Sequence, residues 1–204
     1  MIGIIDYGLG NINAFANIYK RIGVPFDIIK NPNDLANVTH IILPGVGSFD
    51  YCMKKLEGSN FIDALNVQVL QNKKYILGIC VGMQILANSS EEGVLSGLGW
   101  IDAKVEKFAN NNDCSQKLRV PHIGWNTVSG ETSSNLFGKL KKERFYFLHS
   151  YHFVPQRDKN IGARSWYGRE IISAVEQQNI FGVQFHPEKS HDSGLKLLNN
   201  FARL

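Results

Sequence analysis

The feature that most constrains this chain is a short apolar run, broken by glycines, that leads into a cysteine. Residues 75–79 read Tyr-Ile-Leu-Gly-Ile, and the chain continues as Cys80-Val81-Gly82-Met83-Gln84. A continuous apolar run of this length predicts a buried parallel strand, and the helical spacing of residues 83–87 predicts a helix after it. We therefore expect Cys80 on a tight strand-to-helix turn, where its side chain projects at the carboxyl edge of a sheet.

The sequence around this turn favours a reactive cysteine. Glycines two residues before and two after Cys80 let neighbouring backbone come close. The predicted helix directs its unpaired N–H groups and its positive dipole end at the sulfur, which stabilises the reactive thiolate. A single cysteine beside a strand is also a common core residue, so the turn alone leaves both interpretations open.

A second motif favours chemistry. Residues 182–188 read Gly-Val-Gln-Phe-His-Pro-Glu, a strand-like run that Pro187 ends. Alternate residues of an extended segment face the same way, so we expect Glu188 to hold one ring nitrogen of His186 while the other faces a thiol. Cys80, His186 and Glu188 then have the roles of nucleophile, base and orienting carboxylate.

The order of predicted elements indicates an α/β fold. Strands are expected at residues 2–5, 25–29, 38–43 and 75–79, and helices at residues 13–22, 50–57 and 61–71. This alternation predicts a doubly wound, mostly parallel sheet with flanking helices, which binds ligands outside the carboxyl ends of its strands. After residue 93 the chain turns β-rich, with candidate strands at residues 100–108, 120–128, 145–149, 162–166, 171–176 and 180–185 and a final helix at residues 193–204.

A glycine-bearing loop follows the third predicted strand at the same sheet edge. It reads Pro44-Gly45-Val46-Gly47. A thiol attacking an acyl carbon forms a thioester through an oxyanion, which the N–H of Val81 and an N–H of this loop would stabilise. Because glycine permits a peptide to flip, the loop could switch the activity on and off. The alternative is a plain tight turn.

Composition narrows the class of protein. With 204 residues, 44% hydrophobic and 20% charged, the chain fits one globular domain over residues 1–204. No segment has the apolar length of a membrane span, and residues 1–6 are strand-like without a basic leader, so we expect a cytoplasmic protein without a membrane partner. The net charge of +4 comes from scattered lysines and arginines, and the run at residues 139–144 is interpreted as a solvated turn, so no nucleic-acid partner is expected.

The sequence indicates no cofactor or metal. The three cysteines, Cys52, Cys80 and Cys114, are odd in number, widely spaced and without a Cys-x-x-Cys pair, which favours neither disulfides nor a zinc site. The loop at residues 8–13 begins like a dinucleotide fingerprint, but Asn13 stands where the third glycine would be.

Taken together, the elbow, the Pro-Gly-Val-Gly loop and the Phe-His-Pro-Glu end resemble the class I (triad) glutamine amidotransferases over essentially the whole chain. Within that class, four segments are similar to the glutaminase subunits of imidazole glycerol phosphate synthases: Asp6-Tyr7-Gly8, residues 121–126 (Pro-His-Ile-Gly-Trp-Asn), His149-Ser150-Tyr151 and residues 186–190 (His-Pro-Glu-Lys-Ser). The resemblance implies the flavodoxin-like fold of this class with a β-rich second half.

The resemblance also implies an activity and a partner. Such a subunit hydrolyses L-glutamine to glutamate and ammonia, and a separate (β/α)8-barrel cyclase subunit receives the ammonia through a tunnel. The ligand of the barrel switches the glutaminase on. Cys80 would be the nucleophile, His186 the base and acid, and Glu188 the orienter. The implied glutamine-binding residues are the loop glycines and a further set: Gly45, Gly47, Gln84, Glu92, Ser150 and Tyr151.

Trp125, Asn126 and Lys189 resemble the family's positions at the interface with the barrel. An exposed Trp beside the mouth of a site is a plausible docking anchor, whereas a Trp in the β-rich half could equally belong to the core. Three further histidines, His122, His149 and His152, lack carboxylate spacing and are interpreted as structural.

Three other functions stay open. The nearest is a paralogous glutaminase that supplies ammonia to a sugar-modifying enzyme of surface-polysaccharide biosynthesis. A stand-alone cysteine hydrolase is a second, although the Gly-Met-Gln continuation after Cys80 is not expected there. A binding module with an inactive elbow is a third, although all triad positions carry competent residues.

Overall fold

The structure is a computed structural model that describes residues 1–108, 118–138, 140 and 142–204. Within these residues the helices are α1 (Ile12–Arg21), α2 (Phe49–Gly58), α3 (Phe61–Leu65), α4 (Val81–Gln84) and α5 (His191–Phe201). The strands are β1 (Ile2–Ile5), β2 (Phe26–Ile29), β3 (His40–Gly45), β4 (Tyr75–Cys80), β5 (Ser89–Ser90), β6 (Ala103–Lys107), β7 (His122–Gly130), β8 (Lys142–His149), β9 (Tyr151–Pro155), β10 (Ile161–Trp166), β11 (Glu170–Gln177) and β12 (Ile180–Val183).

One continuous sheet joins the two halves of the chain. In the described residues its strand order is β2-β1-β3-β4-β12-β11-β10-β7-β8, and β5, β6 and β9 form a small second sheet. The strands from β2 to β12 pair in parallel, whereas those from β12 to β8 pair antiparallel. The fold is therefore the expected α/β sheet with a β-rich second half, and β12 is the strand at which the parallel part meets the antiparallel part.

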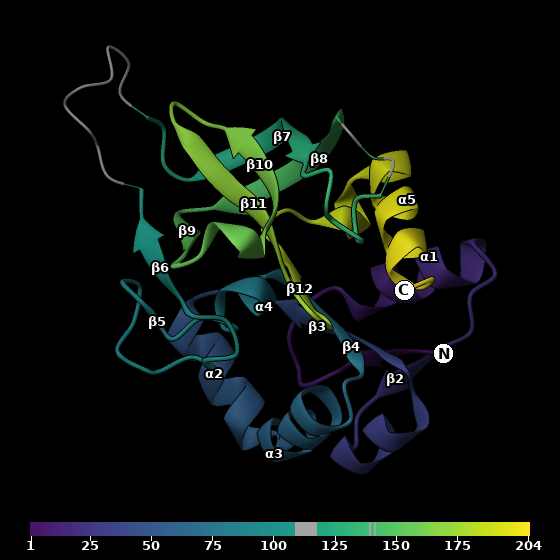
Figure 1. The fold of residues 1–204 in the computed structure, drawn as a ribbon. Coiled ribbons are helices and arrows are strands. Elements are labelled where there is room, and N and C mark those ends of the chain that lie inside the picture. Colours follow the sequence, from purple (N-terminus) through teal and green to yellow (C-terminus); the bar gives the residue numbers. More distant parts are fainter. Residues whose placement is uncertain (109–117, 139, 141) are drawn as a thin grey trace.

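Helices cover both faces of the parallel part, as the doubly wound prediction requires. In Figure 1, α1 and α5 lie on one side of the sheet, and α2, α3 and α4 lie on the other. All residues of β1 are buried, as are all of β4 except Tyr75, which explains why these strands read as continuous apolar runs. Ligands of such sheets bind outside the carboxyl ends of the strands, which is the end of β4 that carries Cys80.

Several elements differ from the expected ones. The helix after Cys80 ends at Gln84, because Leu86 and Ala87 make only three-residue turns, to Met83 and Gln84, before β5 begins. Strands β5 and β9 were not expected, and the charged run interpreted as a solvated turn contains the start of β8 at Lys142. No helix in the described ranges is both long and apolar enough to cross a membrane. Cys114 lies outside the described residues.

Helix α5 packs against the turn that follows the predicted catalytic histidine. A Cβ added to Gly194 would lie 1.8 Å from the carbonyl oxygen of Pro187, whereas one added to Gly58, at the end of α2, would meet nothing within 4 Å. Close packing therefore requires glycine at position 194, whereas position 58 has room for a side chain.

We expect Gly194→Ala to lower the free energy of unfolding by about 1–3 kcal/mol, since backbone must shift to admit the methyl group. Gly58→Ala is the matched control and should be neutral or stabilising by up to about 1 kcal/mol, because Ala lowers the entropy cost of a helix. Urea unfolding of both variants checks this. Equal effects would contradict the close packing of α5 on Pro187.

Candidate active site

The turn between β4 and α4 has the geometry of a nucleophile elbow. Cys80 has φ 56° and ψ −111°, a left-handed conformation that L-residues other than glycine rarely adopt. A Cβ added to Gly78 would lie 2.4 Å from the carbonyl oxygen of Gly82, and one added to Gly82 would lie 2.1 Å from that of Leu43. Both flanking glycines are therefore required by close backbone packing, as the sequence predicted.

Strand register brings the glycine-bearing loop beside the cysteine. Strands β3 and β4 pair with Gly45 opposite Cys80. A Cβ added to Gly45 would lie 2.0 Å from the Gly82 nitrogen, so the loop and the elbow touch through backbone alone. Beyond this contact Gly47 takes a φ of +90°, and Val46 is 38% exposed.

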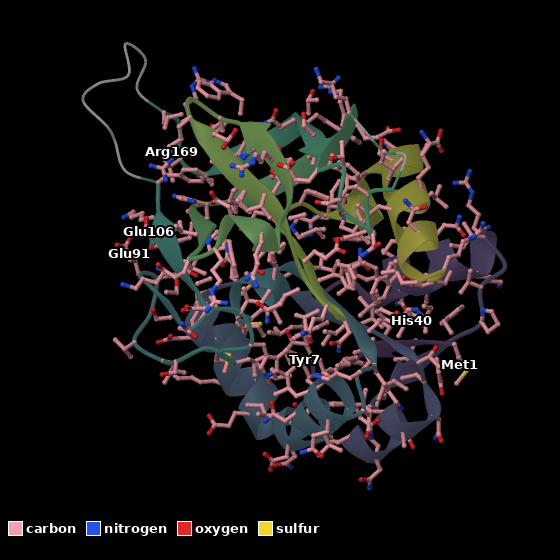
Figure 2. The ribbon with its side chains drawn as sticks, in the orientation of Figure 1. Met1, Tyr7, His40, Glu91, Glu106 and Arg169 are labelled. Atoms are coloured by element: carbon pink, nitrogen blue, oxygen red, sulfur yellow. The ribbon has the colours of Figure 1, made fainter. Side chains whose placement is uncertain are left out.

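A buried tyrosine holds the first residue of that loop. The Tyr7 hydroxyl donates to the carbonyl oxygen of Pro44 and lies 3.1 Å from Cys52 Sγ. Figure 2 shows Tyr7 in the interior of the molecule. Burial, together with the neighbouring Cys52, raises the pKa of Tyr7, and burial raises the pKa of Cys52 to about 12, so both groups stay protonated. The loop is thus fixed at Pro44, while Val46 lies at the surface.

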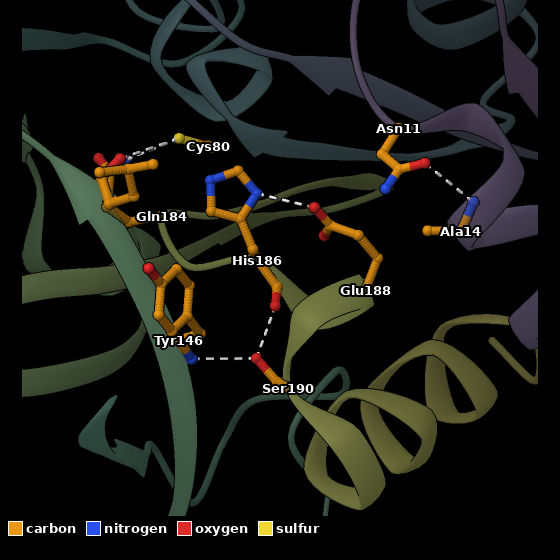
Figure 3. Close-up of polar contacts among 9 residues, drawn as sticks. Asn11, Ala14, Cys80, Tyr146, Gln184, His186, Glu188 and Ser190 are labelled. Atoms are coloured by element: carbon orange, nitrogen blue, oxygen red, sulfur yellow. Dashed lines mark hydrogen bonds and ion pairs between the residues drawn. The ribbon is translucent and has the colours of Figure 1, made fainter. Parts of the chain in front are cut away.

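His186 and Glu188 form the expected pair, but through a turn. Strand β12 ends at Val183, and Pro187–Lys189 is a 3₁₀ turn. It folds Glu188 back so that His186 Nδ1 and Glu188 Oε1 are 2.8 Å apart, both side chains being about 95% buried. In Figure 3 the His186 ring lies between Glu188 and Cys80. The sequence argument named the correct pair and the wrong local geometry, because Pro187 ends the extended segment one residue after His186.

Strand β8 fastens this turn from the other half of the sheet. The His186 N–H donates to the carbonyl oxygen of Tyr146 at 2.8 Å. The Tyr146 N–H donates to Ser190 Oγ at 3.0 Å, and Ser190 Oγ donates to the carbonyl oxygen of His186 at 2.6 Å (Figure 3). His186 is therefore held through its backbone as well as through ring atom Nδ1.

The surroundings of His186 favour its protonated form. Burial lowers the pKa of His186, but its hydrogen bonds to Cys80 and Glu188 and the charges of both outweigh burial and raise the pKa to about 10. A protonated imidazole beside a thiolate is the form in which such a pair attacks an acyl carbon. Glu188 Oε2 is buried and has no hydrogen-bond partner in the described part of the chain.

A cavity of about 270 Å³ lies in front of Cys80. The predicted site residues that line it are Val46, Gly47, Cys80, Val81, Gln84, Glu92, Ser150, Tyr151, His186 and Lys189. Pro121, Leu148 and His149 also line it and were not assigned to the site from the sequence. Gly45 and Glu188 support the lining from behind. The elbow, the loop and the turn, which are far apart in sequence, therefore converge on one cavity.

Gln84 and Glu92 have fixed positions in this cavity. Gln84 is buried, and its Nε2 donates to the carbonyl oxygen of Tyr151 at 3.2 Å and to Gln184 Oε1 at 3.1 Å. Glu92 Oε2 accepts the N–H of Phe49, the first residue of α2, at 2.8 Å. Neither side chain is therefore free in solvent.

Two buried histidines hold the Ser150-Tyr151 segment. His149 Nδ1 lies 2.7 Å from the carbonyl oxygen of Tyr151, so this nitrogen carries the proton. His149 Nε2 then accepts from His122 Nδ1 at 2.9 Å, and His122 Nε2 accepts from Asn126 Nδ2 at 3.3 Å. Burial lowers the pKa of His149 to about 3 and that of His122 to about 4, so both rings are neutral.

The remaining predicted residues lie on or near the outer face of β7 and β8. Trp125 is 40% exposed and stacks on His191 with ring centroids 5.3 Å apart, which excludes the core interpretation. Lys189 Nζ lies 5.9 Å from the ring centroid of Tyr146. Asn126 alternates with Trp125 along β7, and its amide donates inward to the carbonyl oxygen of Trp166 at 2.9 Å.

Comparison with known proteins identifies the class. The model of the class-I glutamine amidotransferase family matches residues 3–204, so the chain belongs to this family. Two solved structures share its fold: one described as a glutamine amidotransferase (20% identity, TM-score 0.74, covering 100% of this chain and 99% of that one), and PurLQS from Thermotoga maritima (21%, TM-score 0.73, 99% and 97%).

More similar relatives carry a more particular name. The protein named imidazole glycerol phosphate synthase subunit HisH is 50% identical to this chain in Bdellovibrio bacteriovorus and 51% identical in Leptospira interrogans, in each case over 205 residues and 100% of both chains. A Pseudomonas aeruginosa protein named imidazole glycerol phosphate synthase subunit HisH 2 is 42% identical over 100% of both chains.

We expect Cys80→Ala and Cys80→Gly both to abolish glutamine hydrolysis, because each lacks the thiol. They should differ in stability. Glycine relieves a left-handed conformation that costs about 1–3 kcal/mol, against a loss of up to about 1 kcal/mol from its flexible unfolded chain. Urea unfolding should therefore find Cys80→Gly at least as stable as Cys80→Ala. Residual glutaminase activity in either variant would disprove the assignment of the nucleophile.

The neutral state of His149 predicts a pH dependence of stability. Its pKa is about 3 when folded and near 6.5 when unfolded, so the unfolded chain binds the proton more readily. The stability due to the neutral ring is present above about pH 6.5 and is lost as the pH falls towards 3. The free energy by which the parent exceeds His149→Gln should fall by about 2 kcal/mol between pH 7.5 and 5, as measured by urea unfolding. A difference independent of pH would contradict this prediction.

Proposed function

We propose that this chain is the glutaminase subunit of an imidazole glycerol phosphate synthase and that residues 1–204 form one glutaminase domain. The observation that carries the proposal is the convergence of Cys80, His186 and Glu188 at one cavity that opens beside an exposed apolar face. The names of the full-length relatives at about 50% identity support it. As part of the proposal we assign the activity to the cytoplasm, where free thiols such as Cys52 and Cys80 stay reduced.

The first half of the reaction forms a thioester. His186 holds the proton of Cys80, and the thiolate attacks the carboxamide carbon of glutamine. The resulting oxyanion is stabilised by the Val81 N–H and by an N–H that the exposed Val46 peptide would turn into the cavity. When the intermediate collapses, the C–N bond breaks, His186 gives its proton to the leaving nitrogen, and ammonia departs.

The second half releases glutamate. A water molecule attacks the thioester carbonyl while His186 takes one of its protons, and the C–S bond breaks to return Cys80 as a thiolate beside protonated His186. Glu188 Oε1 holds Nδ1 throughout, so Nε2 is the nitrogen that exchanges protons. The set of residues needs no metal or cofactor for either half.

The product ammonia requires an acceptor, and an exposed face beside the cavity is suited to bind the partner that accepts it. We call Ile123, Trp125, Tyr146, Leu148 and Lys189 the docking face. Register places Ile123 opposite Leu148 and Trp125 opposite Tyr146. Ile123 is 57% and Leu148 41% exposed, and Leu148 and Lys189 also line the cavity. A partner seated on this face would cover the cavity mouth and receive ammonia directly.

The partner in this proposal is a (β/α)8-barrel cyclase subunit, which uses the ammonia to make imidazole glycerol phosphate and an aminoimidazole carboxamide ribonucleotide in histidine biosynthesis. Trp125 and Lys189 would contact it from the docking face. Asn126 would support the docking face from its inner side through hydrogen bonds to Trp166 and His122, because its amide points inward.

A second candidate has the same chemistry and another acceptor. Some relatives carry copy numbers in their names, HisH 1 in Campylobacter jejuni and HisH 2 in Pseudomonas aeruginosa and Methanococcus maripaludis. This chain is 42–48% identical to them, so a paralogue serving a sugar-modifying enzyme remains the alternative.

The deciding experiment measures glutamate release by the purified protein alone and with the cyclase barrel of the same organism, with and without the cyclase's ribonucleotide ligand. Ligand-dependent stimulation by that barrel is expected. Turnover only with the partner of a sugar-modification gene cluster would leave the glutaminase chemistry in place and move the pathway to the alternative.

We expect Trp125→Ala to weaken binding of the barrel at least about thirtyfold, as removal of a buried aromatic anchor does at an interface. Val67→Ala is the control, because Val67 is equally exposed at 40% but belongs to the π-helical segment Asn66–Gln71, outside the docking face. Titration calorimetry with the barrel measures both. Equal affinities for the two variants would show that Trp125 lies outside the interface.

A further inference from the structure

A buried amide next to the nucleophile has no part in the mechanism above. Gln184 is 0% exposed, and it lies beside Cys80 because β12 pairs with β4 in the register that sets Val183 opposite Ile79. Its Nε2 is 3.8 Å from Cys80 Sγ (Figure 3). An unpaired amide in such a place would be costly, so its partners indicate what it does there.

The partners of Gln184 form a relay that ends on a backbone carbonyl. Gln184 Oε1 accepts from Gln84 Nε2 at 3.1 Å, and the same Gln84 nitrogen donates to the carbonyl oxygen of Tyr151 at 3.2 Å. A carbonyl can only accept, so the Gln84 nitrogen must face Tyr151. Gln84 therefore directs N–H at Gln184 Oε1, and the NH₂ group of Gln184 is left facing Cys80.

The Tyr151 carbonyl is itself held from the opposite side. It accepts from His149 Nδ1 at 2.7 Å as well as from Gln84, which occupies both of its lone pairs. No freedom remains for the relay to reverse. Both protons of the Gln84 amide nitrogen are also committed, so Gln84 can offer the cavity only its Oε1.

Besides His186, two polar groups contact Cys80 Sγ. One contact suits the thiol and the other suits the thiolate. The thiol can donate to the carbonyl oxygen of Leu148 at 3.8 Å, whereas the thiolate has no proton to give. Gln184 Nε2 can only donate, so its contact strengthens when Sγ is negative.

We propose that Gln184 positions both reactants of the glutaminase reaction. Its N–H donates to the Cys80 thiolate, and its Oε1 fixes the Gln84 amide so that Gln84 Oε1 accepts an N–H of bound glutamine. The inference rests on the proposed function for the second part. The first part concerns the free protein and stands without a substrate.

The test compares Gln184→Met with Gln84→Met in the full chain. The rate of Cys80 alkylation by iodoacetamide at pH 7, followed on the Cys80 peptide by mass spectrometry, reports the thiolate. Gln184→Met should alkylate about tenfold more slowly, since it loses a hydrogen bond to a charged group. Gln84→Met should slow alkylation by a smaller factor, because the Gln184 N–H remains but loses the partner that orients it.

Steady-state glutamine hydrolysis with the partner separates the two roles. Gln84→Met should raise KM with a smaller effect on kcat, whereas Gln184→Met should raise KM and lower kcat about tenfold. Asn179→Ala is the control: it removes a buried amide at the other end of β12, which donates to the carbonyls of Val69 and Lys74. It should lose stability and keep the parental alkylation rate and kinetic constants.

Parental alkylation and kcat in Gln184→Met would overturn the proposal. If that variant does not fold, Gln184→Asn retains a buried amide one methylene shorter, and it should slow alkylation in the same direction; a parental rate there would equally overturn it. A failure of the proposed pathway would appear instead as absent hydrolysis in the parent, with the alkylation difference between the two Met variants unchanged.

Discussion

The site depends on contact between two pieces of backbone. The end of β3 and the start of α4 meet through Leu43, Gly45 and Gly82 with no side chain between them, at separations that no Cβ would allow. Because of this contact the loop that we propose to stabilise the oxyanion lies directly beside the elbow, and Cys80 is forced into a left-handed conformation that only a well-supported turn sustains. A single backbone contact thus fixes both Cys80 and the loop, and glycine at two positions makes this contact possible.

The second half of the sheet completes what the parallel half begins. The parallel strands supply Cys80, the proposed nucleophile, but His186, the proposed base, is held by β8, an antiparallel strand, through the backbone of Tyr146 and the hydroxyl of Ser190. Burial in this junction opposes a charge on His186, and its protonated form is stable there because Glu188 and Cys80 are its partners. The proposed triad therefore lies at the boundary between the two types of strand pairing.

Local spacing was enough to propose the triad, since Cys80 lies within a strand-to-helix pattern and His186 and Glu188 lie two residues apart at the end of a strand-like run. It was not enough for Gln184, Leu148 and His149. Their places depend on which strands become neighbours, β12 with β4 and β7 with β8, and pairings between distant segments leave no periodic signal. Strand β5 is two polar residues long, too short for periodicity to detect, and α4 is four residues long and ends at Gln84, so its bounds differ from those that the spacing of residues 83–87 predicted. The exposure of Trp125 could not be predicted, because the sequence of one strand does not show which of its two faces other elements cover.

Tyr146 has two sides that serve different purposes. Its backbone fastens His186, while its ring packs edge-on against Trp125 at 6.2 Å and lies under Lys189 on the surface. A substitution at position 146 keeps the N–H and C=O groups that fasten His186, and only proline would remove the N–H. Selection on this side chain is therefore selection on its surface contacts with Trp125 and Lys189, while the backbone contacts of His186 persist with almost any residue there.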